Sequence, residues 1–414
     1  MLEEKTKILK AVQRLDGWIS TNAWAGWDPY DIKEYLPSTL LERQSNILAK
    51  RIIKKILLEA IELFPLSARK IFHVRPKINA KAMGLFLAGY ANLFEATRQE
   101  HFLIRAHECA DWLIQNRSQG YSGLSWGYPF DWQSIRYIPK LTPSSVVTAT
   151  VGDGFYLLYK ITNDPKLLDI CKRICTFFTE NLRITHKSQQ ALCYSYTPID
   201  DYQVHNANLF VGEYLVRIGK DINDIGLIER GINCGNFALK EQQAGGYLPY
   251  WGLAQTCSHS SGKLRTDHYH SGFEIRMLYK LWKHTGLDTF QRGYMKYFRW
   301  YLRNMFVSGY IPKMTPDEFY PVNIHSCAEV LLCQSTLLSD HPERISGIMR
   351  SIDWILNKME YAPGRYAYLV KKYPAIGELR INIAMIRWGQ AWMLRAYSEL
   401  LKFIMKNQGL NHNP

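Results

Sequence analysis

Several side chains able to take part in acid–base chemistry lie close together in residues 265–274, which read RTDHYHSGFE. Histidine titrates near neutral pH, so an imidazole in this stretch can accept a proton from a substrate. Abstraction of the C5 proton of a sugar acid needs such a base, together with cations or amides that stabilise the resulting enolate. The residues that suit this chemistry are His270, His205, Tyr269 and Arg265.

A second chemistry is open to the same region. Asp267, in this stretch, and Asp131, in an upstream loop, could form the pair of carboxyl groups used in glycoside hydrolysis. One carboxyl group would then act as the acid and the other as the base or nucleophile. The sequence does not decide between hydrolysis and proton abstraction.

Three histidines occupy equivalent positions in the chain. His205, His270 and His325 each precede a small residue of an apolar run by two positions. A lone histidine is more often a hydrogen-bonded core residue than a catalyst, but the shared spacing favours a common site. Equivalent positions on adjacent helices lie around a ring, and no second ligand follows one helical turn away, so we expect no metal site and no cofactor.

The elements that must position these residues follow from a repeat. Polar segments precede apolar, helix-like runs, and the small residue of each run recurs at separations of 55 to 65 residues; the aligned residues are Gly84, Ala149, Ala207, Gly272, Cys327 and Gln390. Two helices of roughly 15 to 20 residues and their loops fill about 60 residues. A helix pair cannot bury its own apolar face, so such units stack, and six can close a ring.

The repeat therefore predicts an all-α fold, an (α/α)6 toroid with six inner and six outer helices. We expect inner helices to begin near Ser145, His205, His270, His325 and Arg387, with a polar mouth at that end. An open helical solenoid without a mouth is the alternative. No linker rich in Pro, Gly or Ser interrupts the 414 residues, so residues 1–414 are predicted to form one domain.

Aromatic residues gather in the loops that precede these helices. In the loop at residues 120–134, Trp126, Tyr128, Phe130 and Trp132 surround Asp131, and these aromatic side chains either fold on themselves or line a pocket. We expect a pocket wall. The predicted substrate-binding residues are Trp126, Tyr128, Trp132, Asn206, Trp251, Arg265, His325, Arg387 and Trp388, and the predicted catalytic residues are His270, His205, Asp267, Asp131 and Tyr269.

Residues 1–40 are expected to form an N-terminal helix and an aromatic segment. Trp24, Trp27 and Tyr30 lie where Pro29 and Pro37 interrupt regular helix. Such a segment could be a lid against which sugar rings stack, or a plug that seals one end of the ring.

Composition narrows the function classes. The net charge is +14, but the basic residues are dispersed apart from short runs such as Lys54 and Lys55, and no nucleic-acid-binding motif accompanies them. The excess favours an acidic partner, and we expect no nucleic acid. Eight cysteines without paired spacing favour a reducing compartment. With no signal peptide and no apolar run long enough to span a bilayer, a cytoplasmic location is expected.

Four motifs carry a resemblance to a known family: GWDPYD from Gly26, WGYPFDW from Trp126, VHNANLF from Val204 and DHYHSGF from Asp267. Together they resemble a bacterial protein group associated with exopolysaccharide, capsule and lipopolysaccharide biosynthesis, within the six-hairpin glycosidase-like superfamily. The resemblance covers residues 26–273, and the later repeats match in pattern only. One departure is Ser271, where the group has threonine.

The resemblance implies an (α/α)6 fold and a role in making or trimming surface glycans. The superfamily includes glycoside hydrolases, uronate lyases and epimerases, so the reaction stays open. We expect a carbohydrate-active enzyme that acts on an oligo- or polysaccharide, and the basic balance favours an acidic one. The alternative is a non-catalytic glycan-binding or scaffold protein associated with other polysaccharide-biosynthesis proteins. Isoprenoid cyclisation is disfavoured because the chain has no DxDD-like motif.

Overall fold

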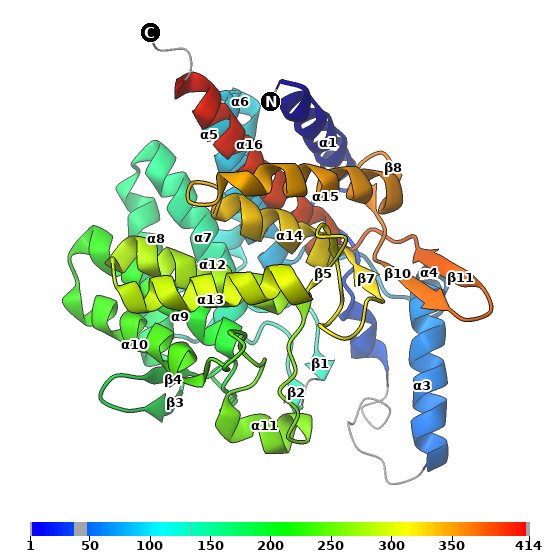
Figure 1. Cartoon of the computed structure of the whole chain (residues 1–414), viewed down its shortest axis with the longest axis horizontal. Helices are drawn as coiled ribbons and strands as arrows, with labels where there is room; N and C mark the ends of the chain where they lie inside the picture. Colours follow the sequence, from blue (N-terminus) through cyan, green and yellow to red (C-terminus); the bar gives the residue numbers. More distant parts are fainter. Residues whose placement is uncertain (1, 37–47, 134, 411–414) are drawn as a thin grey trace.

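Six long helices form a closed inner ring in the computed structural model, which describes residues 2–36, 48–133 and 135–410 (Figure 1). Each inner helix packs against the next, and the last packs against the first. The inner helices are α5 (Ala80–Thr97), α7 (Ser145–Thr162), α9 (His205–Ile222), α12 (His268–Thr285), α14 (Ile324–Thr336) and α16 (Trp392–Leu410). The contact between α5 and α16 closes the ring and excludes the open solenoid.

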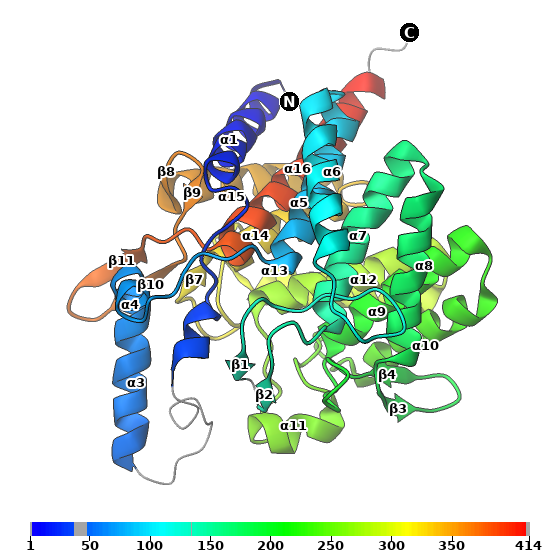
Figure 2. The ribbon, with the colours of Figure 1, turned by 180° about the vertical axis from the view of Figure 1, so that it is seen from behind.

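An outer helix backs each inner one. In chain order these are α6 (Glu100–Gln115), α8 (Pro165–Glu180), α10 (Ile225–Glu241), α13 (Asp288–Asn304) and α15 (Ile345–Lys358). The sixth outer position is taken by α1 (Leu2–Thr21), which packs on α16 and completes the last hairpin. Figure 2 shows α1, α16 and α6 together from behind. The predicted all-α (α/α)6 toroid is confirmed.

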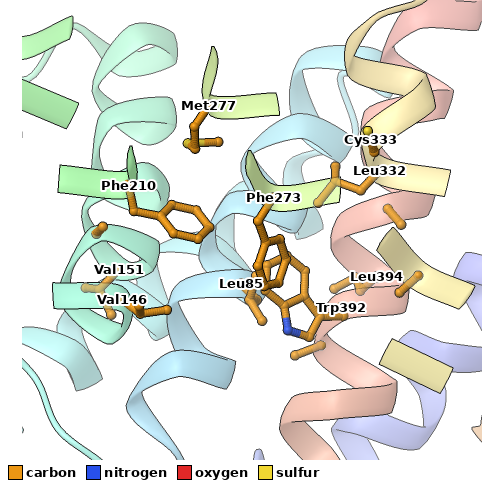
Figure 3. Close-up of a cluster of buried hydrophobic side chains, with 14 of the residues drawn as sticks. Leu85, Val146, Val151, Phe210, Phe273, Met277, Leu332, Cys333, Trp392 and Leu394 are labelled. Carbon is orange, nitrogen blue, oxygen red and sulfur yellow. The ribbon is translucent and has the colours of Figure 1, made fainter. Parts of the chain in front are cut away.

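The middle of the ring is filled by large apolar side chains of the inner helices. Phe210, Phe273 and Trp392 meet there, and Phe273 stacks on Trp392 with 5.2 Å between ring centroids and 29° between ring planes (Figure 3). Inner helices are buried on nearly all sides, whereas an outer helix such as α13 buries one stripe: Phe290, Gly293, Tyr294, Tyr297, Phe298 and Tyr301. This stripe has the spacing of one helical face.

Small residues let the inner helices approach one another. A Cβ at Gly84 of α5 would lie 2.7 Å from the Cα of Val151 in α7, and one at Gly272 of α12 would lie 2.4 Å from Cγ of Glu329 in α14. Both distances are too short for real carbon atoms, so a larger residue would push the helices apart. This is the physical reason for the repeat of small residues.

The inner helices begin within two residues of the predicted positions. Helices α7 and α9 begin at Ser145 and His205, while the last inner helix begins with a short π-helical turn, η3 (Ile386–Ala391). Several polar residues at these points cap the helix: the side chains of Asn79, Ser144, Asp267 and Asn323 accept hydrogen bonds from backbone amides of the first turn.

Short elements occupy the loops. Two-stranded antiparallel pairs join β1 (Trp132–Gln133) with β2 (Tyr137–Ile138), β3 (Ile184–Lys187) with β4 (Leu192–Tyr194), β5 (Phe306–Val307) with β6 (Ile311–Pro312), and β8 (Glu360–Ala362) with β9 (Arg365–Tyr366). A three-stranded sheet has the order β11 (Gly377–Ile381), β10 (Leu369–Tyr373), β7 (Val322–Asn323). The remaining helices are η1 (Asp31–Tyr35), α3 (Leu48–Leu63), α4 (Pro65–Ile71), α11 (Leu253–Ser260) and η2 (Pro342–Arg344).

Buried ion pairs fix the segment after α1 to η3 at the start of the last inner helix and to α4. Arg387 donates from Nε and Nη2 to the two carboxylate oxygens of Asp28, at 2.7 and 2.8 Å, and Arg69 pairs with Asp31 at 2.7 Å. Trp24 packs against Phe86 and Tyr90 of the core. Pro37 and the rest of the predicted segment to residue 40 lie outside the described residues. No helix in the described ranges is both long and apolar enough to cross a membrane.

Candidate functional site

A cavity of about 230 Å³ lies at the end of the ring where the inner helices begin. It is smaller than the roughly 300 to 1,000 Å³ of pockets for drug-sized ligands, so it can hold only a small ligand or one end of a longer one. Nine predicted site residues line it: Tyr128, Trp132, Asn206, Trp251, Tyr269, His270, His325, Arg387 and Trp388. These predicted residues come from five of the six repeats and meet at one place.

Three predicted residues lie elsewhere. Trp126 is buried, and its indole nitrogen donates to the backbone oxygen of Leu113 at 2.8 Å, so it packs into the core instead of the cavity. Asp131 accepts a hydrogen bond from the backbone amide of Lys140 at 2.6 Å and braces its own loop. The side chain of Arg265 is exposed to solvent. The prediction that these residues border the cavity is corrected.

His205 also lies outside the cavity. Its ring nitrogens are 2.7 Å from the backbone oxygen of Pro249 and 2.8 Å from Oε2 of Glu241. Its backbone amide donates to the oxygen of Tyr250, so the loop that precedes the next inner helix lies over this histidine. Both ring nitrogens are engaged, and the predicted catalytic position of His205 is corrected to that of a structural brace.

Asp267 does not line the cavity but holds the histidine that does. Its Oδ1 accepts from the backbone amide of His270 at 3.1 Å and caps α12, and its Oδ2 lies 2.6 Å from Nδ1 of the same histidine. An ionised carboxylate only accepts hydrogen bonds, so the neutral form of the imidazole carries its proton on Nδ1 and presents Nε2 as a proton acceptor. The rings of Tyr250 and Tyr269 flank the imidazole at centroid distances of 4.6 and 4.2 Å.

The charged groups of the cavity wall are cationic. Lys33, Lys81 and Arg387 line it together with His270 and His325, and no Asp or Glu is among the described residues that do so. Burial opposes the charge of Arg387, but the paired carboxylate of Asp28 outweighs it and raises the pKa of Arg387 above its ordinary value. Arg387 therefore stays charged, as one half of a buried ion pair with Asp28.

Lys33 and Lys81 lose their protons more readily than Arg387 does. Burial lowers the pKa of Lys33 to about 8, and burial also lowers the pKa of Lys81 well below its ordinary value. The ammonium group of Lys81 lies 5.6 Å from the ring centre of Trp392, and no carboxylate pairs with it in the described chain. An anionic ligand would favour the protonated form of both side chains.

Several buried polar atoms of the wall have no hydrogen-bond partner within the described protein. They are Oδ1 of Asn206, both ring nitrogens of His325 and Nε1 of Trp388. The ring of His325 stacks on Tyr269 at 4.3 Å, and burial lowers the pKa of His325 well below its ordinary value, so this ring is neutral. Unpaired buried polar groups are costly, and sugar hydroxyl groups can both donate to and accept from them.

Sequence reasoning missed the two lysines. Lys81 interrupts an otherwise apolar run, AKAMGLFLAGY, in the first turn of α5. A charge in an apolar inner helix at the phase of the other site residues is the signal that could have identified it. In the part of the chain that the structure describes, no three His, Cys, Asp or Glu side chains gather closely enough to hold a metal ion.

Comparison with known proteins shows likeness at the level of structure. No family model matches the chain, and no curated protein matches it in sequence. A cellobiose 2-epimerase from Bacillus thermoamylovorans superposes with a TM-score of 0.61 at 12% identity over 81% of this chain and 90% of that one. A family 76 α-mannanase from Bacteroides thetaiotaomicron gives 0.59 at 10% identity over 80% and 88%.

The Lin0763 protein of Listeria innocua covers nearly the whole chain, with a TM-score of 0.61 at 12% identity over 99% of each chain. Identities this low leave open what the chain acts on. The likeness therefore establishes the fold alone, and this chain has the (α/α)6 toroid that these three proteins share.

Proposed function

We propose that this protein is a carbohydrate-active enzyme that transfers a proton at a carbon atom of an acidic sugar, as an epimerase or a lyase does. The observation that carries the proposal is the His270–Asp267 pair, with Nε2 of the imidazole free to accept a proton beside walls whose charges are all cationic. His270 is the proposed general base. Asp267 is the proposed positioning residue.

The chemistry of a sugar acid fits this arrangement. Removal of the C5 proton of a uronate leaves an enolate with increased negative charge on the carboxylate. Arg387 provides a cation at the cavity wall, and the negative charge of the ligand favours the protonated forms of Lys33 and Lys81. Preorganised cations stabilise such charge as it develops. Return of a proton to the opposite face gives an epimer, and loss of the C4 substituent gives an unsaturated product.

Glycoside hydrolysis receives less support. Hydrolysis by two carboxyl groups requires them to flank the scissile bond at about 5 to 10 Å from one another. No carboxyl group lines the cavity among the described residues, and Asp28, behind the wall, is paired with Arg387. The aromatic residues Trp132, Trp251 and Trp388 offer faces for sugar rings under any of these reactions.

The biological setting is proposed from the sequence motifs. The resemblance to bacterial proteins of exopolysaccharide, capsule and lipopolysaccharide biosynthesis supports a substrate taken from a surface polysaccharide or its precursor. The second candidate is a non-catalytic protein that binds glycans or acts as a scaffold for other polysaccharide-biosynthesis proteins. The unpaired polar atoms of Asn206 and His325 would serve glycan binding equally well.

Hydrogen exchange at carbon separates these candidates. Oligosaccharides that contain uronic acid are incubated with the protein in D2O, and deuterium at C5 and unsaturated products are measured by mass spectrometry. We expect exchange or elimination with the wild type and its loss in His270→Ala, with binding retained in calorimetry. Binding without exchange or product in the wild type would favour the scaffold, and an unchanged rate in His270→Ala would reject His270 as the base.

A further inference from the structure

Helix α3 (Leu48–Leu63) stands apart from the ring. Figures 1 and 2 both show it projecting from the body beside the loops of the mouth, attached at its C-terminal end near α4 and the β10–β11 hairpin. Most of its side chains are accessible to solvent. The helix is thus placed to contact something other than its own chain.

Two glutamates tie α3 to the rest of the protein. Nζ of Lys371, in β10, lies 2.7 Å from Glu59 and 2.9 Å from Glu62, and the hydroxyl of Tyr373 also donates to Glu59. Leu58, Ile61 and Glu62 line the space between α3 and the rest of the protein. Residues of an α-helix are 100° apart around its axis, so Ile52, Ile53 and Ile56 lie on the side opposite Leu58. Helix α3 therefore carries apolar side chains on two sides: Ile61 and Leu63 pack against buried clusters of the protein, and the three isoleucines lie on the outer side.

The outward face is strongly apolar. Ile52, Ile53 and Ile56 are 50%, 58% and 64% exposed, and Phe64, directly after the helix, is 65% exposed. A contiguous apolar face of this kind on the surface of a soluble protein marks an interaction site. Arg51 and Lys55 are exposed on the same helix, and Lys55, three positions after Ile52, lies at the edge of this face.

We propose that α3 docks on the surface of an anionic lipid bilayer, with Ile52, Ile53 and Ile56 in the boundary between headgroups and acyl chains. A helix with one apolar face and flanking basic residues lies in this interface, and each basic residue near an anionic surface adds to binding. With 16 residues and charges along its length, α3 is too short and too polar to span the bilayer.

Charge favours a bilayer over a second copy of the chain. The protein carries a net charge of +14, so two copies repel each other whereas an anionic surface attracts each of them. Docking would also place the membrane beside the site. The inner side of α3 contributes Leu58, Ile61 and Glu62 to a neighbouring cavity, and Tyr30 and Lys33 line both that cavity and the candidate site.

Vesicle flotation tests the proposal. The full chain is mixed with vesicles of equal parts phosphatidylglycerol and phosphatidylcholine, or of phosphatidylcholine alone. We expect the wild type to float with the anionic vesicles and far less with the neutral ones. In Ile53→Asp/Ile56→Asp, partitioning to anionic vesicles should fall on the order of 100-fold, because two apolar side chains are lost from the interface.

The matched control is Ile104→Asp/Ile225→Asp. These isoleucines lie on α6 and α10, are 58% and 70% exposed, and their replacement changes the net charge by the same amount. The control should float as the wild type does, and circular dichroism should show both variants folded. Equal loss of flotation in both variants would mean that net charge alone accounts for the binding, and it would overturn the proposal. So would equal flotation with neutral vesicles, or a dimer in light scattering that Ile53→Asp/Ile56→Asp dissociates.

Discussion

Replacement of Asp267 by asparagine should separate the two tasks of this side chain. In the structure Oδ1 caps α12 and Oδ2 orients the imidazole of His270. Asparagine caps a helix about as well as aspartate, because its amide oxygen accepts the same backbone bond. Its amide nitrogen, however, is a donor, so it would face Nδ1 of His270 and move the ring proton to Nε2. Nε2 of His270 would then carry a proton and could not accept one from the substrate.

The magnitudes follow from these contacts. In Ser-His-Asp hydrolases, an Asp→Asn change that imposes the wrong histidine tautomer lowers kcat about 10⁴-fold, and we expect a loss approaching that size here. Stability should barely change in Asp267→Asn. In Asp267→Ala the cap is lost at about 1 kcal/mol. With roughly 2.1 cal/mol/K of unfolding entropy per residue over 414 residues, that cost lowers Tm by only about 1 °C.

The assay measures kcat, KM and Tm for the wild type and both variants, with a uronic acid oligosaccharide as substrate. The expected pattern for Asp267→Asn is an unchanged Tm, a KM near that of the wild type and a severe loss of kcat. A variant that keeps kcat within tenfold of the wild type would refute the assigned tautomer. A Tm lowered by several degrees would instead make Asp267 chiefly structural.

Three further predictions concern buried charges. Arg387→Met leaves the carboxylate of Asp28 buried without its main partner, which should lower the free energy of unfolding by roughly 3 to 5 kcal/mol. Calorimetry should show part of that loss recovered in Asp28→Asn/Arg387→Met. An unchanged Tm in the single variant would contradict the argument. Since burial lowers the pKa of Lys33 to about 8, this cation is lost as pH rises through 8; KM for an acidic sugar should rise there in the wild type but stay level in Lys33→Met. Burial lowers the pKa of His268 to about 3, so between that value and the ordinary one near 6.5 the unfolded chain binds a proton that the folded chain does not. Stability should therefore fall as pH drops from 6.5 toward 3, and less so in His268→Gln, which keeps an acceptor for the hydroxyl of Tyr301.

The fold could be predicted because its causes are local and periodic. Small residues such as Gly84 and Gly272 recur where inner helices approach, and their spacing is visible in the sequence. Polar residues before each apolar run marked the mouth correctly, although part of that signal is helix capping: Asp267 and Asn323 both cap helices. A cap and a site residue look alike in the sequence, because both are polar side chains before a helix.

The site could be predicted only in part because loops decide which side chains reach the cavity. His205 and His270 share the same spacing, yet the loop containing Pro249 covers the first, whereas the second faces the cavity. Nothing in the spacing tells where that loop passes. Lys81 was missed for another reason. Its pKa is lowered by burial and by the nearby charge of Arg387, and both conditions exist only after the ring has closed.

The closure of the ring sets an order of events during synthesis. The amide of Asn92 in α5 donates to Glu399 in α16 at 2.8 Å, although the two residues are 307 positions apart in the sequence. At about 5 to 20 residues per second, a ribosome needs roughly 15 to 60 s to cover that distance. Throughout this time the apolar side of α5 that α16 will cover has no native partner. A chain stalled before α16 therefore exposes that side, and chaperones or proteases would recognise it as unfinished.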